Sequence, residues 1–335
     1  MSVPHPEPVR LGVLGCADIA VRRVLPAVAG HPGLRLVAVA SRRRGKAAAV
    51  TEVTGGEPVE GYDRLLARAD VDAVYIPLPP ALHADWIERA LRAGKHVLAE
   101  KPLSLRHRDT AALVALARSR GLVLLENVMF PHHRAHQQVA ALLADGAIGR
   151  PQTFSSTFTV PRRAPDDIRH QAGLGGGALL DNAVYPLRAA RLLLGGAWSV
   201  AGAVMRTDSR LGVDLGGSAL LTRADGLAAA VGFGLNHAYT CRYEIVGSTG
   251  RIVLDRAFTP PPDHRPRLLL ERDGRTETHL LEADDQCRNL LGFFVAAVRG
   301  QTDWSAAARD TVEAAALVDQ VRAAAAGGSD PFPGR

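Results

Sequence analysis

The chain has 335 residues, of which 47% are hydrophobic and 22% are charged, and its formal net charge at pH 7 is +6. This composition is typical of a globular protein long enough for two domains, and the lack of an apolar run of about 18 residues excludes a membrane-spanning helix. Because the basic residues are spread along the chain and aromatic residues make up only 5%, the charge favours a polyanionic small molecule over nucleic acid as the partner.

The first half of the chain, through residue 127, alternates short apolar runs with longer helical patterns. The runs predict strands at Val9–Gly15, Leu34–Ser41, Ala73–Pro77, His96–Ala99 and Leu122–Glu126. The patterns between them predict helices at Asp18–Ala29, Gly45–Val53, Tyr62–Ala67, Ala81–Ala93 and Arg108–Ser119. Strands this apolar are covered on both faces, so we predict an α/β fold with a parallel, dinucleotide-binding (Rossmann) sheet at residues 1–127.

From residue 128 to residue 335 the pattern changes, and we predict a second α/β domain with an open, mostly antiparallel sheet. Turn pairs such as Asp225-Gly226, Thr249-Gly250 and Asp273-Gly274 indicate hairpins. The predicted strands are Gln152–Val160, Ser199–Arg206, Ser218–Arg223, Leu227–Asn236, Arg242–Val246, Arg251–Leu254, Arg267–Glu271 and Glu277–Leu281. The predicted helices are Arg134–Ala144, Ala178–Leu194, Asp285–Val298 and Ala306–Ala325, and the last two could pack back on the first domain.

Two features bear on the cellular compartment. Residues Met1–Arg10 carry Pro and His where a secretory signal has a basic flank and an apolar core, so we expect no signal. The cysteines Cys16, Cys241 and Cys287 lie far apart without metal-ligand spacing. They favour the reducing cytoplasm and argue against a disulfide framework or a zinc site.

The first strand–turn–helix predicts a dinucleotide site. In the fingerprint, three glycines serve the tight turn, the approach of the pyrophosphate and helix packing, and here Gly15, Ala17 and Ala20 occupy those places. The fingerprint is therefore incomplete, but its position in the first βα unit favours a cofactor. The expected cofactor residues are Gly15, Cys16, Ala17, Asp18, Ile19, Ser41, Arg42, Arg43, Pro77, Leu78, His83, Glu100, Lys101 and Asn127.

The end of the second strand indicates which nicotinamide cofactor is bound. NAD calls for a carboxylate at this point, whereas arginine accommodates the 2′-phosphate of NADP. The chain has Ser41 followed by Arg42, Arg43 and Arg44, with no carboxylate. We therefore expect NADP(H).

Lysine is rare in this chain, which makes Lys101 informative. Lysine occurs only at Lys46, Lys95 and Lys101, although 40 residues are lysine or arginine. We expect Lys46 and Lys95 to be ordinary surface residues. Lys101 follows the apolar run His96–Ala99 at the carboxyl end of a predicted parallel strand, where open α/β sheets bind ligands, so we expect it in the site.

Three segments, in this order and spacing, resemble the Gfo/Idh/MocA oxidoreductases: residues 14–20 (LGCADIA), 94–102 (GKHVLAEKP) and 175–186 (GGGALLDNAVYP). Residues 126–130 (ENVMF), 167–169 (DIR) and 255–266 (DRAFTPPPDHRP) are similar to the nucleotide-hexose 3-ketoreductases of deoxysugar biosynthesis within that family. The resemblance spans nearly the whole chain. It implies NADPH-dependent reduction of a keto group, at C-3, of a nucleoside-diphosphate-linked deoxysugar.

The resemblance also implies roles for particular residues. Lys101 would contact the cofactor and the substrate. The later family motif usually reads Asp, any residue, Gly, any residue, His, with an acid three positions on; here Ala183 replaces the Gly, Tyr185 the His and Arg188 the acid. Tyrosine in the histidine place disfavours a polyol dehydrogenase. The family commonly forms oligomers through its C-terminal sheet, so we expect a dimer or tetramer.

The residues themselves support a catalytic pair of Lys101 and Tyr185. Hydride transfer leaves negative charge on a carbonyl oxygen, so a ketoreductase needs a proton donor beside it. Tyrosine can supply the proton, and a neighbouring ammonium stabilises the phenolate that remains. Tyr185 could instead be a core residue of an amphipathic helix. Asp181, one helical turn earlier, either orients Tyr185 or the substrate or caps the helix after the glycine turn.

Other candidates for the substrate site are weaker. Arg162, Arg163 and Arg169 could donate hydrogen bonds to a diphosphate or be exposed loop charges. The histidines His132, His133 and His136 lack a suitably spaced further ligand, so we expect no metal. The expected substrate-binding residues are Lys101, Phe130, Arg163, Asp181, Tyr185 and Phe258, the last as part of a cradle for the nucleotide base. The alternatives are an NADP-dependent dehydrogenase of free sugars or trans-dihydrodiols and a non-catalytic NADP-binding regulatory protein.

Overall fold

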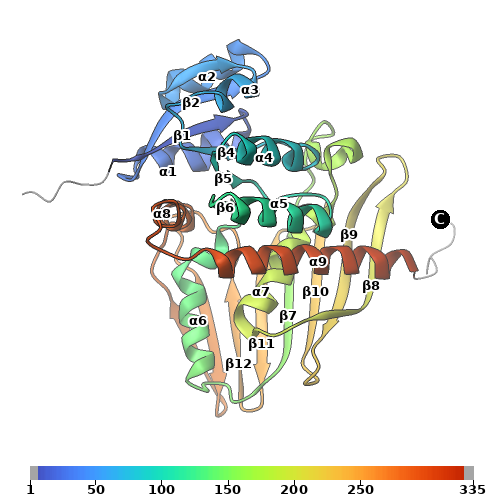
Figure 1. Ribbon diagram of the computed structural model, residues 1–335. Helices are drawn as coiled ribbons and strands as arrows, with labels where there is room; N and C mark the ends of the chain where they lie inside the picture. The colour runs from blue at the N-terminus through green and yellow to red at the C-terminus, as the bar shows by residue number, and fades with distance from the viewer. Residues whose placement is uncertain (1–6, 328–335) are drawn as a thin grey trace, which may run out of the picture. The chain divides into compact units, whose positions relative to one another are not determined.

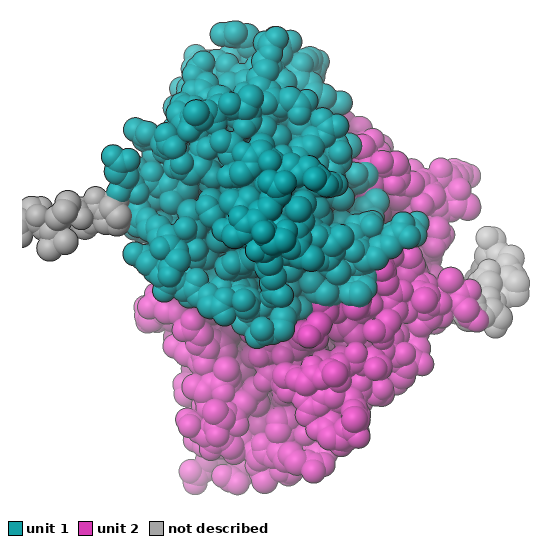
Figure 2. Space-filling view, in the orientation of Figure 1, with its two compact units in different colours: residues 1–128, 287–312 teal, residues 129–286, 313–335 magenta. Residues whose placement is uncertain are grey.

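The computed structural model describes residues 7–327, so the expectation about a signal in Met1–Arg10 falls mostly outside the described residues. The chain divides into two compact units, coloured separately in Figure 2. The first comprises the chain up to Val128 together with Cys287–Val312, and the second comprises Met129–Gln286 together with the chain from Glu313. The expected boundary at residue 127 thus lies one residue away, but the division also assigns a C-terminal segment to the first unit.

That segment joins the first unit through contacts that no local pattern reveals. The thiol of Cys287 lies 3.9 Å from the carbonyl oxygen of Arg23, and Arg299 donates to the carbonyl oxygen of Glu7 at 2.8 Å. The segment contains α8 (Gln286–Val298) and the start of α9 (Ser305–Gly327). The first unit is therefore built from two stretches of the chain far apart in sequence.

The first unit contains a six-stranded parallel sheet in the order β3-β2-β1-β4-β5-β6 (Figure 1). Its strands are β1 Val9–Leu14, β2 Leu34–Ser41, β3 Glu57–Glu60, β4 Ala73–Ile76, β5 His96–Ala99 and β6 Leu124–Glu126. The predicted Rossmann sheet is confirmed, and the strand order reverses between β1 and β4, where such sheets bind ligands. The pattern missed β3 because Val59 is its one buried residue.

The helices of the first unit follow the prediction closely. They are α1 Leu25–Ala29, α2 Arg44–Thr54, α3 Tyr62–Leu66, α4 His83–Arg92 and α5 His107–Ser119. A π-helical turn, Ala20–Val24, precedes α1 within the helix predicted over Asp18–Ala29. Among the sheet residues, Val74, Val97 and Leu124 are buried in the hydrophobic core.

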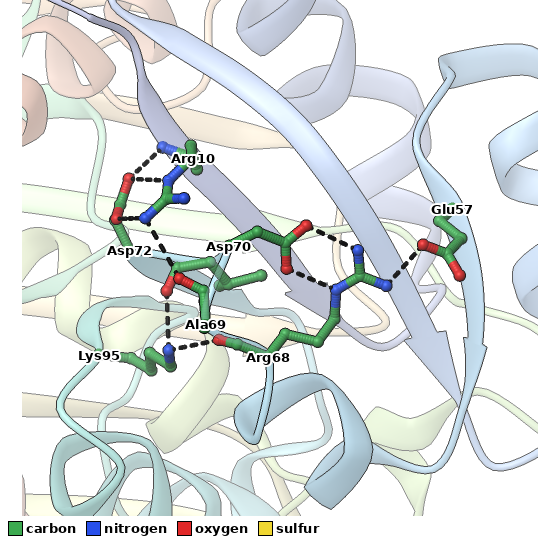
Figure 3. Close-up of polar contacts among 8 residues, drawn as sticks. Arg10, Glu57, Arg68, Ala69, Asp70, Asp72 and Lys95 are labelled. Atoms are coloured by element: carbon green, nitrogen blue, oxygen red, sulfur yellow. Dashed lines mark hydrogen bonds and ion pairs between the residues drawn. The ribbon is translucent and has the colours of Figure 1, made fainter.

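Lys95 is not the surface residue that we expected. Only 9% of it is exposed, and its ammonium donates to the carbonyl oxygens of Arg68 at 2.7 Å and Val71 at 2.8 Å (Figure 3). The same turn carries the bidentate pair between Arg10 and Asp72. Lys95 therefore stabilises the entry to β4, because buried carbonyl oxygens need donors. The expectation failed because these partners lie more than twenty residues away along the chain.

The second unit contains an eight-stranded sheet in the order β14-β13-β12-β11-β7-β10-β9-β8. Only β7 and β10 pair in parallel among the strand pairs that the structure describes. The strands are β7 Pro151–Val160, β8 Ser199–Asp208, β9 Val213–Thr222, β10 Ala228–Leu235, β11 Thr240–Gly247, β12 Gly250–Asp255, β13 Arg267–Arg272 and β14 Arg275–Leu280. The predicted open, mostly antiparallel sheet is confirmed.

Helices α6 (Arg134–Ala144) and α7 (Val184–Leu194) lie on one face of this sheet (Figure 1). Asp273 and Gly274, both with positive φ, form the turn between β13 and β14 as predicted. The turn predicted at Thr249-Gly250 is displaced, because Gly250 already begins β12. Within residues 7–327, no helix is long and apolar enough to cross a membrane.

Candidate active site

The turn after β1 brings together residues expected at the cofactor. Gly15 has φ of +122°, and a Cβ built on it would lie 3.0 Å from the Leu78 side chain and 3.3 Å from the Pro77 carbonyl oxygen. A side chain at this position would be strained and would collide with the loop after β4. Gly15, Pro77 and Leu78 therefore meet at the switch point, and the glycine lets the backbone approach a phosphate closely.

The remaining residues of the turn lie at different depths. Ala20 is wholly buried, as expected for the helix-packing position, whereas Cys16, Ala17 and Ile19 are half-buried. Asp18 is exposed and forms an ion pair with Arg22, four residues along the helix. Burial raises the pKa of the Cys16 thiol, and the nearby Ser41 side chain opposes that shift.

At the end of β2, Ser41 is buried while Arg42 and Arg43 are exposed. The Ser41 hydroxyl accepts a hydrogen bond from the backbone of Arg43 at 3.3 Å. Burial raises the pKa of Tyr62, and the Arg42 guanidinium beside it opposes that shift. Two exposed guanidinium groups and a buried hydroxyl at this strand end suit a 2′-phosphate.

Glu100 connects three strand ends. One of its carboxylate oxygens accepts hydrogen bonds from the Tyr75 hydroxyl at 2.6 Å and from the Asn127 amide at 2.5 Å. Tyr75 belongs to β4 and Asn127 follows β6. Burial raises the pKa of Tyr75, and the Glu100 charge raises it further, so Tyr75 stays a donor. Glu100 thus fixes the backbone that precedes the half-buried Lys101.

His83, which was expected at the cofactor, is a buried residue with backbone partners on both sides of its ring. The side chain is 0% exposed, and its ring nitrogens lie 2.7 Å from the Pro102 carbonyl oxygen and 2.6 Å from the Leu78 carbonyl oxygen. Both polar atoms of the ring therefore face the protein. Backbone partners of this kind leave no trace in the sequence.

In the second unit, Tyr185 lies in the first turn of α7 and is half-buried. Its ring packs edge-on against Phe158, with 4.8 Å between centroids, and lies 6.0 Å from Phe130 and 5.7 Å from Phe258. Such contacts hold an aromatic ring in one orientation. The ring of Tyr185 thus packs on the core while the residue keeps some exposure, and its catalytic role stays a prediction.

Phe130 and Phe258, which were expected to contact the substrate, are buried beside Tyr185. Both side chains are 0% exposed, so neither ring offers a surface to a ligand. The backbone on either side of Phe258 is anchored, since its N–H donates to the Cys241 sulfur at 3.2 Å and its carbonyl oxygen accepts from Gln286 at 3.1 Å. The two phenylalanines form the wall on which Tyr185 rests.

The glycine turn before Tyr185 is required by close packing. A Cβ on Gly176 would lie 2.5 Å from the Arg169 carbonyl oxygen, and one on Gly177 would lie 2.3 Å from the Asp214 carboxylate. That carboxylate accepts from the backbone N–H of Leu179 at 2.6 Å. Asp214 therefore caps the helix that carries Tyr185, and the expectation that Asp181 might be the cap is wrong.

Asp181 instead accepts a hydrogen bond from Arg169 at 2.6 Å, and Arg169 also pairs with Asp167. The Arg169 guanidinium is thereby bound to carboxylates of its own unit. Arg163 lies in the exposed segment between β7 and the glycine turn. Of the arginines considered for a diphosphate, Arg162 and Arg163 keep exposed side chains.

The histidines near α6 have structural partners. His133 accepts from the backbone N–H of Ala135 at 3.1 Å and so caps α6. His136 contacts the Tyr243 hydroxyl at 3.1 Å and the Ala257 carbonyl oxygen at 2.9 Å. Burial lowers the pKa of His136 to about 3, so it is neutral at physiological pH.

Comparison with known proteins agrees with this architecture. Residues 9–128 match the oxidoreductase family described as GFO/IDH/MocA, NAD-binding Rossmann fold, and residues 136–253 match the GFO/IDH/MocA C-terminal domain. A dTDP-3,4-didehydro-2,6-dideoxy-alpha-D-glucose 3-reductase of Streptomyces violaceoruber is 54% identical, over 97% of this chain and 98% of its own. An NADP(+)-dependent D-xylose 1-dehydrogenase of Haloferax volcanii is 36% identical, over 87% of this chain and 90% of its own.

Among solved structures, a 3-ketoreductase from Actinomadura kijaniata in complex with NADP and TDP-benzene has a TM-score of 0.93 and 50% sequence identity, covering 95% of this chain and 98% of its own. Substituted forms of that ketoreductase have also been solved, one with a tyrosine replaced by phenylalanine and others with a lysine replaced by alanine or glutamate.

Proposed function

Because the chain belongs to the GFO/IDH/MocA oxidoreductase family, we propose that it reduces the C-3 carbonyl of a dTDP-linked 3,4-diketo-2,6-dideoxy sugar with NADPH. The observation that carries this proposal is the full-length similarity, at 54% identity, to a reductase of that substrate. The NADP and TDP-benzene complex of a ketoreductase with the same fold supports both the cofactor and the nucleotide.

The described residues at the switch point fit NADPH. Gly15 keeps the turn after β1 clear for the pyrophosphate, since any Cβ there would meet Leu78. Arg42 and Arg43, exposed at the end of β2, would hold the 2′-phosphate. When bound, NADPH supplies the hydride.

We propose that Tyr185 and Lys101 serve the same carbonyl. As negative charge develops on the carbonyl oxygen, the Tyr185 hydroxyl donates its proton to that oxygen. The Lys101 ammonium stabilises both the developing oxyanion and the phenolate that remains. The hydrogen bonds that fix Glu100, next to Lys101, and the aromatic rings that pack against Tyr185 support these roles. A proton transfer needs its donor and acceptor held at hydrogen-bond distance.

Replacing Arg42 by alanine tests the assignment of the cofactor. We expect a weaker affinity for NADPH, by roughly 10-fold or more, because a charge-assisted bond to the 2′-phosphate contributes about 1.5–3 kcal/mol. The affinity for NADH should hardly change. Dissociation constants from the quenching of protein fluorescence would measure both, with Arg44→Ala as the neighbouring control. Equal losses for the two cofactors would overturn the role of Arg42.

The proposed reaction itself is tested by following NADPH oxidation with freshly prepared dTDP-3,4-didehydro-2,6-dideoxy-glucose, and the product by mass spectrometry. We expect turnover of this ketone and none of free D-xylose with NADP⁺. Oxidation of free sugars without reduction of the nucleotide sugar would favour the dehydrogenase alternative. Cofactor binding without turnover of any carbonyl compound would favour the regulatory one.

We also propose that copies of the chain associate through the sheet face opposite α6 and α7. The large exposed apolar side chains Val204, Leu220, Val246 and Leu280, each at least 38% exposed, all lie on that face by strand register. Exposed apolar side chains that lie on one face of a sheet favour an interaction surface there. Within residues 7–327 no cysteine forms a disulfide, which supports the proposal of a reducing, cytoplasmic compartment.

A further inference from the structure

His83 is the first residue of α4, and its imidazole lies between two backbone carbonyl groups. Nδ1 is 2.7 Å from the Pro102 oxygen, and Nε2 is 2.6 Å from the Leu78 oxygen. Pro102 follows Lys101 directly, and Leu78 is the residue that packs against Gly15. One buried ring therefore connects α4 to the loops after β4 and β5.

His83 differs from His136, which is also buried with a partner at each ring nitrogen, because both partners of His83 are carbonyl oxygens. Carbonyl oxygens only accept hydrogen bonds, so each ring nitrogen of His83 satisfies its partner only when it carries a proton. His136 contacts one carbonyl oxygen and one hydroxyl, and a single neutral tautomer satisfies both. Burial lowers the pKa of His83, while the two carbonyl groups oppose that shift. A neutral His83 can hold only one of its two loops.

The Pro102 contact bears directly on Lys101. The residue before Lys101 is anchored through the Glu100 carboxylate, which Tyr75 and Asn127 hold. The residue after Lys101 is anchored through the Pro102 carbonyl, which His83 holds. The backbone around Lys101 is thus restrained on both sides, and the restraint at the Pro102 carbonyl depends on a single N–H group.

We propose that His83 is the positioning residue for Lys101, and that its Nδ1–H, bonded to the Pro102 carbonyl, sets where the Lys101 ammonium lies. This inference rests on the proposed role of Lys101 in carbonyl reduction. His83 itself is 0% exposed, and the proposal gives it no direct contact with the substrate or the cofactor. Its contribution is to orientation, where a displacement of about 1 Å can cost roughly 100-fold in rate.

Two conservative variants separate the two nitrogens. Asparagine places an amide donor near the position of Nδ1, and glutamine places one near the position of Nε2. We expect His83→Asn to keep kcat within about threefold of the wild type, and His83→Gln to lower it about 10–100-fold, with the KM for the ketone changing much less. Equal losses in the two variants, or a larger loss in His83→Asn, would overturn the proposal.

A control variant distinguishes a displaced Lys101 from a general loss of folding stability. Lys95→Met removes two buried hydrogen bonds of the same unit outside the loops that hold Lys101. We expect it to lower the melting temperature without lowering kcat below the unfolding transition. If Lys95→Met lowers kcat as much as His83→Gln does, the effect of His83 is on stability alone and the proposal fails.

Nitrogen-15 NMR of histidine-labelled protein gives a readout that does not depend on turnover. We expect the Nδ1 of His83 to carry a proton near neutral pH, with the signal identified by its loss in His83→Gln. His136 serves as the internal reference for a neutral ring with an unprotonated Nδ1. A His83 ring protonated only at Nε2 would disprove the bond to Pro102, whatever substrate the wild type reduces. Failure of the wild type to reduce the nucleotide sugar would instead count against the proposed function.

Discussion

Replacing Tyr185 by phenylalanine is expected to lower kcat for the keto sugar by about 10²–10⁴-fold, the usual contribution of a positioned proton donor. The ring of the variant can keep its packing against Phe130, Phe158 and Phe258, so the fold and the melting temperature should change little. Single-turnover measurements under saturating NADPH and ketone would report the chemical step itself.

Tyr239→Phe provides the matched control. Tyr239 belongs to the same unit and is 40% exposed, with its hydroxyl 3.2 Å from that of Thr259. Removal of this exposed hydroxyl should leave kcat unchanged. If Tyr185→Phe retains nearly full turnover at saturating substrate, Tyr185 is not the proton donor.

Replacing Lys101 by methionine is the second large effect that we expect, with kcat lowered by about 10²–10³-fold. Methionine keeps the unbranched shape of the side chain but removes the ammonium that would stabilise the developing oxyanion. The dissociation constant of NADPH should change less than kcat, because the stabilisation is realised in the transition state. Stopped-flow measurement of the hydride step and cofactor titration would separate the two quantities.

Two further lysine variants sharpen this prediction. Lys46→Met removes an exposed lysine and should leave kcat unchanged. Lys101→Arg keeps the charge, but a planar guanidinium cannot take the place of a compact ammonium, so we expect turnover at least roughly 10-fold below the wild type. Full turnover in Lys101→Arg would mean that any positive charge suffices there.

Much of the fold was predictable because burial in a parallel sheet leaves a strong sequence signal. The runs at His96–Ala99 and Leu34–Ser41 form strands with the expected bounds. The prediction missed β3, since an edge strand with charged residues at Glu57 and Glu60 resembles a loop. Hairpin chemistry placed the turn at Asp273-Gly274 because positive φ is required at both positions.

The candidate site was predictable where residue type itself carries the chemistry. Gly15 stands where a Cβ would collide with the loop after β4, and a run of arginines at the end of β2 replaces the carboxylate that NAD requires. Lys101 stood out because lysine is rare in this chain. The sequence did not indicate that Phe130 and Phe258 are completely buried and that their rings pack against Tyr185.

The sequence by itself determined the order of the strands and helices apart from β3, the dinucleotide-binding turn and the two residues proposed for catalysis. Each of these depends on local periodicity or on the chemistry of one side chain. Only the tertiary structure decided that Lys95 is buried, that Asp214 caps the helix carrying Tyr185, and that His83 bonds the segment after Lys101. In each of these cases the partner is a backbone atom of a distant segment. Every residue has the same backbone atoms, so no sequence pattern can mark which of them a buried side chain will meet.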